Sequence, residues 1–133
     1  MKINKTIRVI LADDHPAVRR GIRRMLEKVS NILVVGEAAS GVAALQLVHE
    51  LTPDVLVLDI EMPDMKGHQV AQILRESKFP VSILVLSSCD EDHFIREIVQ
   101  GGVDGYLYKG ETAEKIRQAV FRVSGKYTEP LIN

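Results

Sequence analysis

Three aspartates stand directly behind two apolar segments, and they are the first residues in the chain whose spacing suggests chemistry. Asp13 and Asp14 follow the largely apolar residues 7–12, and Asp59 follows residues 55–58. If these segments form neighbouring parallel strands, the three carboxylates meet at one edge of a sheet. Crowded carboxylates repel each other, and hard divalent cations such as Mg²⁺ prefer oxygen ligands. The spacing therefore predicts an acidic metal pocket.

The strands and helices that must position this pocket are visible as an alternation along the chain. Short apolar segments alternate five times with longer segments whose apolar residues have helical spacing. We expect strands at residues 7–12, 32–36, 55–59, 81–86 and 105–108. We expect helices that begin near Pro16, behind Ser40 and behind Gly67, and two more over residues 91–100 and 112–123. Strands without polar alternation suit a sheet covered on both faces, which predicts an α/β, doubly wound fold with five parallel strands.

The expected buried faces of the first three helices follow from the spacing of their large apolar side chains. In the order of the helices, these are Val18, Ile22, Met25 and Leu26, then Val42, Leu45, Val48 and Leu51, then Val70, Ile73 and Leu74. Each set would pack one helix against the sheet.

Size, composition and charge limit what else the chain can do. It has 133 residues, 46% of them hydrophobic, which fits one domain with a single core. Its 17 basic and 18 acidic residues give a net charge of -1, which does not favour nucleic acid or an anionic membrane. No stretch approaches the roughly 20 apolar residues that span a bilayer, so we expect a cytoplasmic protein without a membrane partner. The single cysteine, Cys89, excludes an intramolecular disulfide and a cysteine-based zinc cluster.

Five polar residues lie at the expected carboxyl ends of four strands. They are Asp13, Asp14, Asp59, Ser87 and Lys109. An open doubly wound sheet binds its ligands at this edge, where the strand order reverses. We therefore expect these residues, although they are distant in sequence, to form one site.

The same residues carry a family resemblance. The segments that carry it are residues 11–16 (LADDHP), 57–67 (VLDIEMPDMKG), 85–87 (VLS) and 105–109 (GYLYK). In this order and at these strand ends, they resemble the receiver domain of a two-component response regulator over nearly the whole chain. The resemblance implies a flavodoxin-like (βα)5 fold with strand order 2-1-3-4-5. It assigns residues 1–124 to the receiver domain and residues 125–133 to a C-terminal tail or the start of a linker.

The resemblance also implies a role for each polar residue at this edge. Asp59 would accept a phosphoryl group from a phosphohistidine of a sensor histidine kinase. Asp14 and Asp59 would bind Mg²⁺ directly, and Asp13 would bind it through water. The backbone carbonyl of Glu61 would complete the protein ligands. Lys109 would hold Asp59 charged and neutralise the phosphoryl oxygens.

Ser87 and Tyr106 are the expected switch residues. After phosphorylation, the Ser87 hydroxyl would donate to the phosphoryl group and draw the following loop inward, and Tyr106 could turn into the vacated space. An aromatic residue in a strand is also ordinary core, so a core position is the open alternative for Tyr106. The movement would alter the face of residues 91–122, which a partner would read, with homodimerisation as one readout. The chain would then be a switch more than an enzyme.

Several alternatives to this function remain open. The motifs most resemble receivers that precede a helix-turn-helix domain, and such a chain would contact DNA only through an output domain absent from this sequence. A single-domain regulator that acts by protein contact fits the same residues. A flavodoxin-like redox carrier shares the sheet, but Asp13 and Asp14 would repel a cofactor phosphate. A phosphohydrolase with an aspartyl nucleophile shares the chemistry, but typically has a second aspartate where this chain has Glu61.

Two further features have both a structural and a functional interpretation. The first expected helix carries a basic stripe of Arg19, Arg20, Arg23 and Arg24. The stripe could contact an acidic patch on a kinase, but a solvated face is the favoured interpretation. His15 lies close to the pocket, and for it we favour a loop or first-turn role over phosphotransfer.

Overall fold

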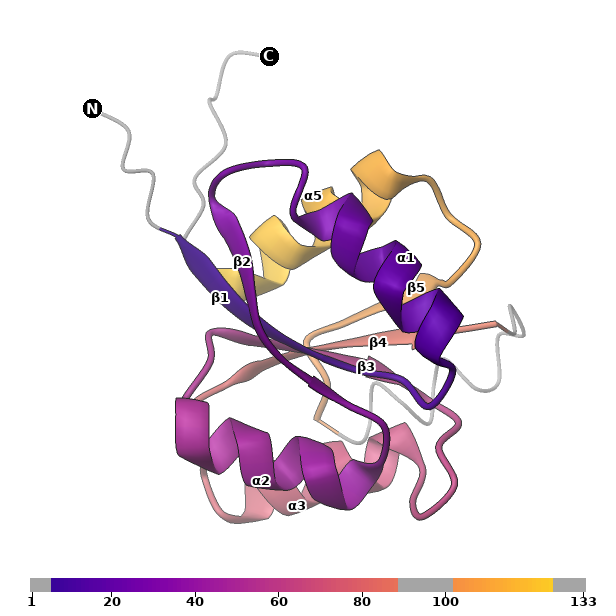
Figure 1. Ribbon diagram of the computed structural model, residues 1–133. Coiled ribbons are helices and arrows are strands. Elements are labelled where there is room, and N and C mark those ends of the chain that lie inside the picture. Colours follow the sequence, from indigo (N-terminus) through magenta and orange to yellow (C-terminus); the bar gives the residue numbers. More distant parts are fainter. Residues whose placement is uncertain (1–5, 89–101, 126–133) are drawn as a thin grey trace.

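Five parallel strands form one sheet in the order β2-β1-β3-β4-β5, as predicted (Figure 1). The structure is a computed structural model that describes residues 6–88 and 102–125. The strands are β1 (Ile7–Ala12), β2 (Ile32–Ala38), β3 (Val55–Asp59), β4 (Ser82–Ser87) and β5 (Gly105–Tyr108). The described helices are α1 (Pro16–Leu26), α2 (Gly41–Leu51), α3 (Gly67–Glu76) and α5 (Ala113–Ser124). The helix predicted over residues 91–100, like Cys89, lies outside the described residues.

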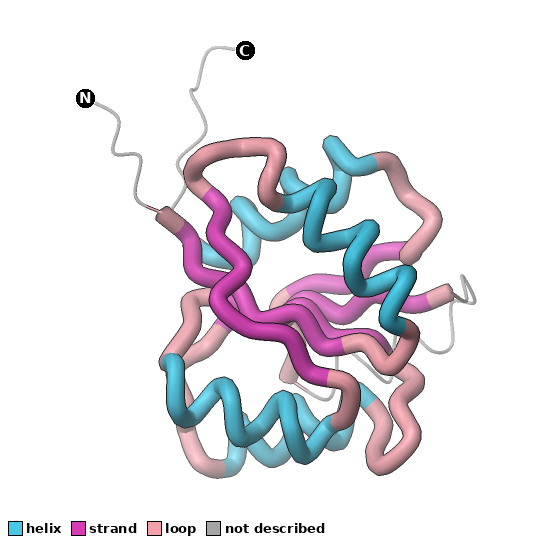
Figure 2. The backbone as a smooth tube through the Cα atoms, viewed as in Figure 1, coloured by secondary structure: helices cyan, strands magenta, loops and turns pink. Residues whose placement is uncertain are grey.

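Helices cover both faces of the sheet, which explains why its strands are apolar throughout. Figure 2 shows α1 and α5 on one side of the strands, with α2 and α3 on the other. In β3, Val55 and Val57 pack in the layer of α1 and α5, and Leu56 and Leu58 pack in the layer of α2 and α3. All four side chains are 0% exposed. Burial of each such side chain stabilises a fold by about 1.5–3 kcal/mol.

The ends of the helices follow from the local sequence. Pro16 is the first residue of α1, where its fixed φ suits the helix and its missing N–H is not needed. The Ser40 side chain accepts a hydrogen bond from the Ala43 N–H and caps α2, as predicted. Gly125 follows α5 with a φ of 68°, a conformation that favours glycine. The division of the chain at residue 124 agrees with this helix end but stays a prediction.

Three of the predicted core positions are wrong. Val18, Val42 and Ile73 are 39%, 50% and 41% exposed. In α2 and α3 the small residues Ala44 and Ala71 are 0% exposed and belong to the core, so the buried face of each helix is shifted toward its alanine from the face that the large residues alone predict. Val18 lies one turn before the first buried residue of α1, at a helix start that is in solvent.

Two strands differ slightly from their predicted bounds. β2 continues two residues further, to Ala38, and β4 spans Ser82–Ser87 instead of residues 81–86. Ser87 is therefore itself a strand residue, with its backbone in the sheet. Among the described helices, none has the length and apolarity that a membrane crossing requires.

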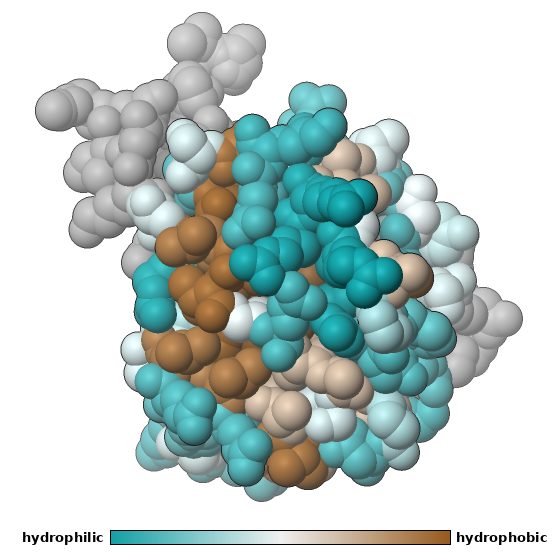
Figure 3. Space-filling model, viewed as in Figure 1, coloured by the Kyte–Doolittle hydropathy of each residue, from teal (hydrophilic) through white to brown (hydrophobic). Residues whose placement is uncertain are grey.

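The outer surface of α1 is strongly hydrophilic, as the teal area over this helix in Figure 3 shows. Arg20 and Arg24 are exposed there, as the interpretation of a solvated face predicts. Arg19 and Arg23 are only partly exposed, because both bind Glu37 of β2. The basic stripe is therefore half solvated and half structural.

Candidate functional site

Parallel pairing of the strands brings the predicted polar residues to one edge of the sheet. Asp59 and Ser87 are the last residues of β3 and β4. Asp13 and Asp14 come directly after β1, and Lys109 comes directly after β5. Because β1 pairs with β3, β3 with β4 and β4 with β5, these ends lie side by side. Five residues that are up to 96 positions apart in sequence therefore share one site.

Backbone hydrogen bonds continue past the strand ends and hold the site residues in register. The Asp13 N–H donates to the Ala38 carbonyl over 3.0 Å, and the Lys109 N–H donates to the Ser87 carbonyl over 2.7 Å. Groups that are carried by regular elements are held more firmly than groups on free loops. The hydrogen-bond pattern of the sheet thus continues one residue past the strand ends, to Asp13 and Lys109.

Lys109 lies between two buried carboxylates. Its Nζ is 2.7 Å from Asp13 Oδ2 and 3.3 Å from Asp59 Oδ2, and these aspartates are only 1% and 4% exposed. Burial raises the pKa of Asp59, the charge of Lys109 opposes the rise, and the charge of Asp13 adds to it. Burial alone would lower the pKa of Lys109, but its hydrogen bond to Asp13 and the charge of Asp59 outweigh this effect and raise it. Lys109 is thus a permanent cation that favours the ionised form of Asp59.

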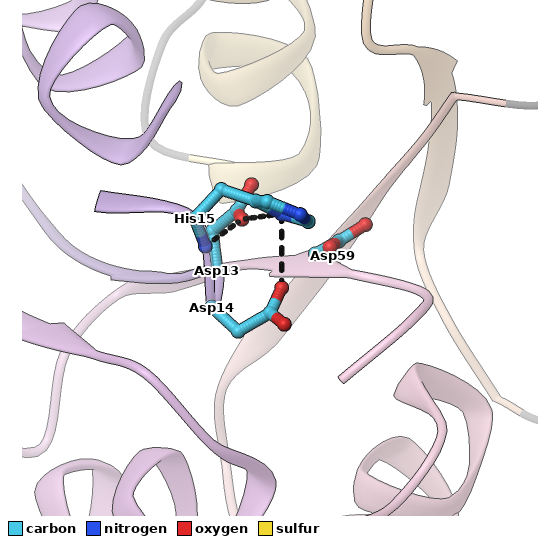
Figure 4. Close-up of side chains that lie close together, drawn as sticks. All are labelled: Asp13, Asp14, His15 and Asp59. Carbon is cyan, nitrogen blue, oxygen red and sulfur yellow. Dashed lines mark hydrogen bonds and ion pairs between the residues drawn. The ribbon is translucent and has the colours of Figure 1, made fainter. Parts of the chain in front are cut away.

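The three aspartates form the acidic pocket that their spacing predicts, and His15 joins them. Figure 4 shows the four side chains close together, and one ligand atom of each lies within 4.8 Å of the other three. Asp14 Oδ1 is buried and accepts no hydrogen bond within the described part of the chain, and its ion-pair partner there is His15 Nδ1 at 3.0 Å. A buried carboxylate oxygen in this state costs free energy unless a cation binds it. The residues present therefore fit a hard divalent cation such as Mg²⁺.

Arg19 binds the backbone carbonyl of Asp13, a contact that the sequence did not predict. Its Nη1 donates to the Asp13 carbonyl over 2.6 Å, and its Nε donates to Glu37 Oε1 over 2.8 Å. Arg23 binds the other oxygen of Glu37, and the two arginines hold the pKa of Glu37 below its usual range. A long cationic side chain soon after a strand end is the only signal in the sequence, and it looks like an ordinary solvated residue.

The loop after Asp59 is held by contacts at Asp64 and at its far end, Gly67. Gly67, the first residue of α3, approaches β3 so closely that an added Cβ would lie 3.0 Å from the Asp59 carbonyl oxygen. The Asp64 carboxylate accepts hydrogen bonds from the Val42 and Gly41 N–H groups at the start of α2, and these bonds hold its pKa below the usual range. The loop therefore has little freedom to move away from Asp59.

Glu61 reaches the site with its backbone. Its N–H donates a hydrogen bond to Asp59, and this bond lowers the pKa of Asp59 to a smaller extent than burial raises it. The Glu61 side chain is 62% exposed, and its Oε1 lies 2.8 Å from Lys66 Nζ. The role of the Glu61 carbonyl as a metal ligand stays a prediction.

Ser87 and Tyr106 lie on neighbouring strands of the sheet. Ser87 is 1% exposed at the end of β4. Tyr106 pairs with Val85, is partly buried, and packs against the core on the side of α2 and α3. This position agrees with the core interpretation of Tyr106. The switch roles of both residues stay predictions.

The chain is similar to signalling proteins over nearly its whole length. Residues 9–121 match the family model described as the response regulator receiver domain. The response regulator GacA of Pseudomonas aeruginosa is 38% identical over 128 residues, which are 95% of this chain and 60% of GacA. The response regulator protein VraR of Staphylococcus aureus is 39% identical over 119 residues, which are 90% of this chain and 57% of VraR. The chain thus spans about three fifths of the length of these relatives.

A solved structure has the same fold. The signal receiver domain of NarL from Mycobacterium tuberculosis, a response regulator, superimposes with a TM-score of 0.88 at 39% identity. The match covers 91% of this chain and 98% of that domain.

Proposed function

The chain belongs to the family of response regulator receiver domains, and from this we propose that it is a phosphorylation-activated switch with Asp59 as its phosphoacceptor. The observation that carries the proposal is the position of Lys109, whose Nζ contacts both Asp13 and Asp59 in a buried pocket. A buried aspartate without a nearby cation takes up a proton more readily, and a protonated carboxyl is a poor nucleophile. Lys109 therefore favours the ionised, nucleophilic form of Asp59.

The transfer would begin from a phosphohistidine of a sensor histidine kinase. A carboxylate oxygen of Asp59 attacks the phosphorus, a P–O bond forms, the P–N bond breaks, and its electron pair returns to the histidine nitrogen. Lys109 balances the charge of Asp59 before the transfer and would contact the phosphoryl oxygens after it. The Ser87 hydroxyl, at the end of the neighbouring strand, would donate to another of these oxygens.

Mg²⁺ is the cofactor that the pocket would hold. Asp14 and Asp59 would bind it directly, Asp13 through water, and Glu61 with its backbone carbonyl. The buried Asp14 Oδ1, whose contact among the described residues is an ion pair with the exposed His15, supports this assignment. When bound, the ion would neutralise negative charge on the phosphoryl oxygens.

Phosphorylation would act on partners through a change of charge at Asp59. A phosphoryl group adds about −1.5 to −2 charges at neutral pH, and Ser87 and Tyr106 would transmit its presence to the face of residues 91–122. We expect this face to control a DNA-binding output domain of a cytoplasmic transcription regulator, with homodimerisation as one readout. The greater length of GacA and VraR supports such a domain outside this sequence. A single-domain regulator that acts by protein contact is the alternative.

Intact mass after incubation with acetyl phosphate tests the proposal. We expect one phosphoryl addition to the wild type in Mg²⁺, none in chelator, and none to Asp59→Asn under either condition. No addition to the wild type, or an undiminished addition to Asp59→Asn, would contradict the proposal. Multiple turnover on a small phosphate ester would instead favour a phosphohydrolase with an aspartyl nucleophile.

A further inference from the structure

His15 lies at the exposed side of the acidic pocket, where its sequence position predicts only a loop or first-turn role. Its backbone N–H donates to Asp13 Oδ1 over 2.9 Å, which fixes the residue at the start of α1. Its side chain makes no hydrogen bond that caps the helix. The ring instead turns toward the carboxylates, and dashed lines in Figure 4 join its Nδ1 to Asp13 and Asp14.

The distance between His15 Nδ1 and Asp14 Oδ1 is that between neighbouring ligands of one metal ion. Nδ1 lies 3.0 Å from Asp14 Oδ1 and 3.3 Å from Asp13 Oδ1. Two ligand atoms at about 2.1 Å from a shared ion are about 3.0 Å apart in octahedral geometry and about 3.4 Å apart in tetrahedral geometry. Asp14 Oδ1, the closer of the two oxygens, is also one of two buried carboxylate oxygens that accept no hydrogen bond in the described residues, the other being Asp13 Oδ2 beside Lys109. The spacing and the burial of this oxygen both fit a cation beside the imidazole.

We propose that His15 Nδ1 is a further side-chain ligand of the acidic pocket, and that the pocket therefore binds Co²⁺, and divalent ions of similar softness such as Ni²⁺ and Zn²⁺, more tightly than Mg²⁺. Imidazole nitrogen suits these borderline ions, whereas Mg²⁺ prefers carboxylate, carbonyl and water oxygens. The His15 side chain is 65% exposed, so the metal site stays open on one side and its ion can exchange. This inference rests on the proposed function, because it uses the same pocket.

A protonated imidazole paired with the two carboxylates would give the same distances without any metal. The two cases differ in what happens when His15 is replaced. If His15 is a ligand, its loss weakens the binding of an ion that prefers nitrogen and leaves Mg²⁺ binding nearly unchanged. If His15 is only a counter-charge, its loss affects all divalent cations in the same direction.

Calorimetric titration of the untagged chain with Co²⁺ and with Mg²⁺ tests the inference. We expect His15→Gln to weaken Co²⁺ binding by about tenfold or more, in line with the effect of disturbing metal-site residues, and to change Mg²⁺ binding by less than about twofold. The matched control is His49→Gln, an exposed histidine on α2 that should leave both affinities at the wild-type value. The visible spectrum of bound Co²⁺ should also change in His15→Gln and not in His49→Gln.

The outcomes separate this inference from the proposed function. Unchanged Co²⁺ binding by His15→Gln, or an equal change for Co²⁺ and Mg²⁺, would overturn the ligand role of His15 and leave the phosphoacceptor proposal standing. Loss of both ions in Asp14→Asn, with normal binding by His49→Gln, would place the site in the acidic pocket as expected. A wild type that binds neither ion would overturn the inference and the magnesium site together.

Discussion

The two edges of the sheet hold their acidic side chains in opposite ways. At the amino edge, Asp54 Oδ2 accepts a hydrogen bond of 2.8 Å from the Arg8 N–H. Asp104 Oδ2 accepts one of 2.8 Å from the Ile83 N–H and lies 2.6 Å from Arg75 Nη2. Each of these carboxylates thus has a backbone donor, and Asp104 has a cation as well. At the carboxyl edge, Asp13 and Asp59 also have a backbone donor each, but three aspartates are crowded into one pocket.

The crowding at the carboxyl edge leaves negative charge in excess. Asp13 and Asp59 are almost fully buried, and the ion pairs of the three aspartates among the described residues are with Lys109 and His15. The raised pKa of Asp59 records the cost of burying its charge. The amino edge therefore uses charge to join elements and gain stability. The carboxyl edge keeps charge available for a cation and a phosphoryl group, although this lowers stability.

Removal of the lysine at the carboxyl edge should have the largest effect. Lys109→Met keeps much of the side-chain volume but removes the cation next to Asp59, so we expect phosphorylation by acetyl phosphate to slow by about 100-fold or more. The initial rate, followed by intact mass in Mg²⁺, measures it. Lys28→Met, at an exposed lysine, is the control and should react at the wild-type rate. A Lys109→Met rate within a factor of about two of the wild type would remove Lys109 from the mechanism.

At the amino edge, the matching change should affect stability and spare the chemistry. Arg75 donates to the Val81 and Gly102 carbonyls and to Asp104. We expect Arg75→Ala to lower the free energy of unfolding by about 2–3 kcal/mol, since three acceptors lose their donor. Urea unfolding measures this loss, and Arg20→Ala is an exposed control. A strong loss of phosphorylation by folded Arg75→Ala would show that the two edges are not separable.

The dependence of stability on pH should have opposite signs at two carboxylates. The pKa of Asp59 is raised above its ordinary value of 3.8, so its stabilising contribution is present below pH 3.8 and is lost as pH rises through the folded pKa. The pKa of Glu37 is lowered from 4.5, so its contribution is present above pH 4.5 and is lost as pH falls through the folded pKa.

Urea unfolding across this pH range can separate the two contributions. The stability of Asp59→Asn relative to the wild type should rise with pH, and that of Glu37→Gln should fall. If both relative stabilities changed with pH in the same direction, the pocket would not raise the pKa of Asp59.

The smallest effect is expected at the exposed pair beside the site. Lys66 and Glu61 are half or more exposed, and such pairs contribute little because water and salt screen them. Lys66→Met should change the free energy of unfolding by less than about 0.5 kcal/mol. Thermal unfolding at low and high salt measures it. A larger, salt-insensitive loss would show that this pair is part of the site.

Most of the fold could be predicted because its determinants are local and repeated. Apolar segments without polar alternation indicate a sheet that is buried on both faces, and β3 shows this burial directly. The exposure of Val42 and Ile73 could not be predicted in the same way. A stripe of large side chains ignores alanine, yet Ala44 and Ala71 lie in the core.

The candidate site likewise has contacts that could be predicted from the sequence and contacts that could not. Asp13, Asp59 and Lys109 could be placed together because parallel strands bring their carboxyl ends to one edge. The contacts of Arg19 and His15 could not be predicted. They depend on the orientation of side chains at the start of α1, which residue spacing does not determine. The sequence favours a solvated role for Arg19 and a loop role for His15, whereas in the structure Arg19 contacts Asp13 and His15 contacts Asp14.

The central claim, that the carboxyl edge holds excess charge for a cation, is tested most directly by urea unfolding of the wild type and Asp59→Asn with and without saturating Mg²⁺. Without Mg²⁺ we expect Asp59→Asn to be the more stable protein, because its neutral amide removes one of the crowded charges. Mg²⁺ should stabilise the wild type by binding the folded state and should stabilise Asp59→Asn less. A wild type that is more stable than Asp59→Asn without Mg²⁺, and that does not respond to the ion, would contradict the claim.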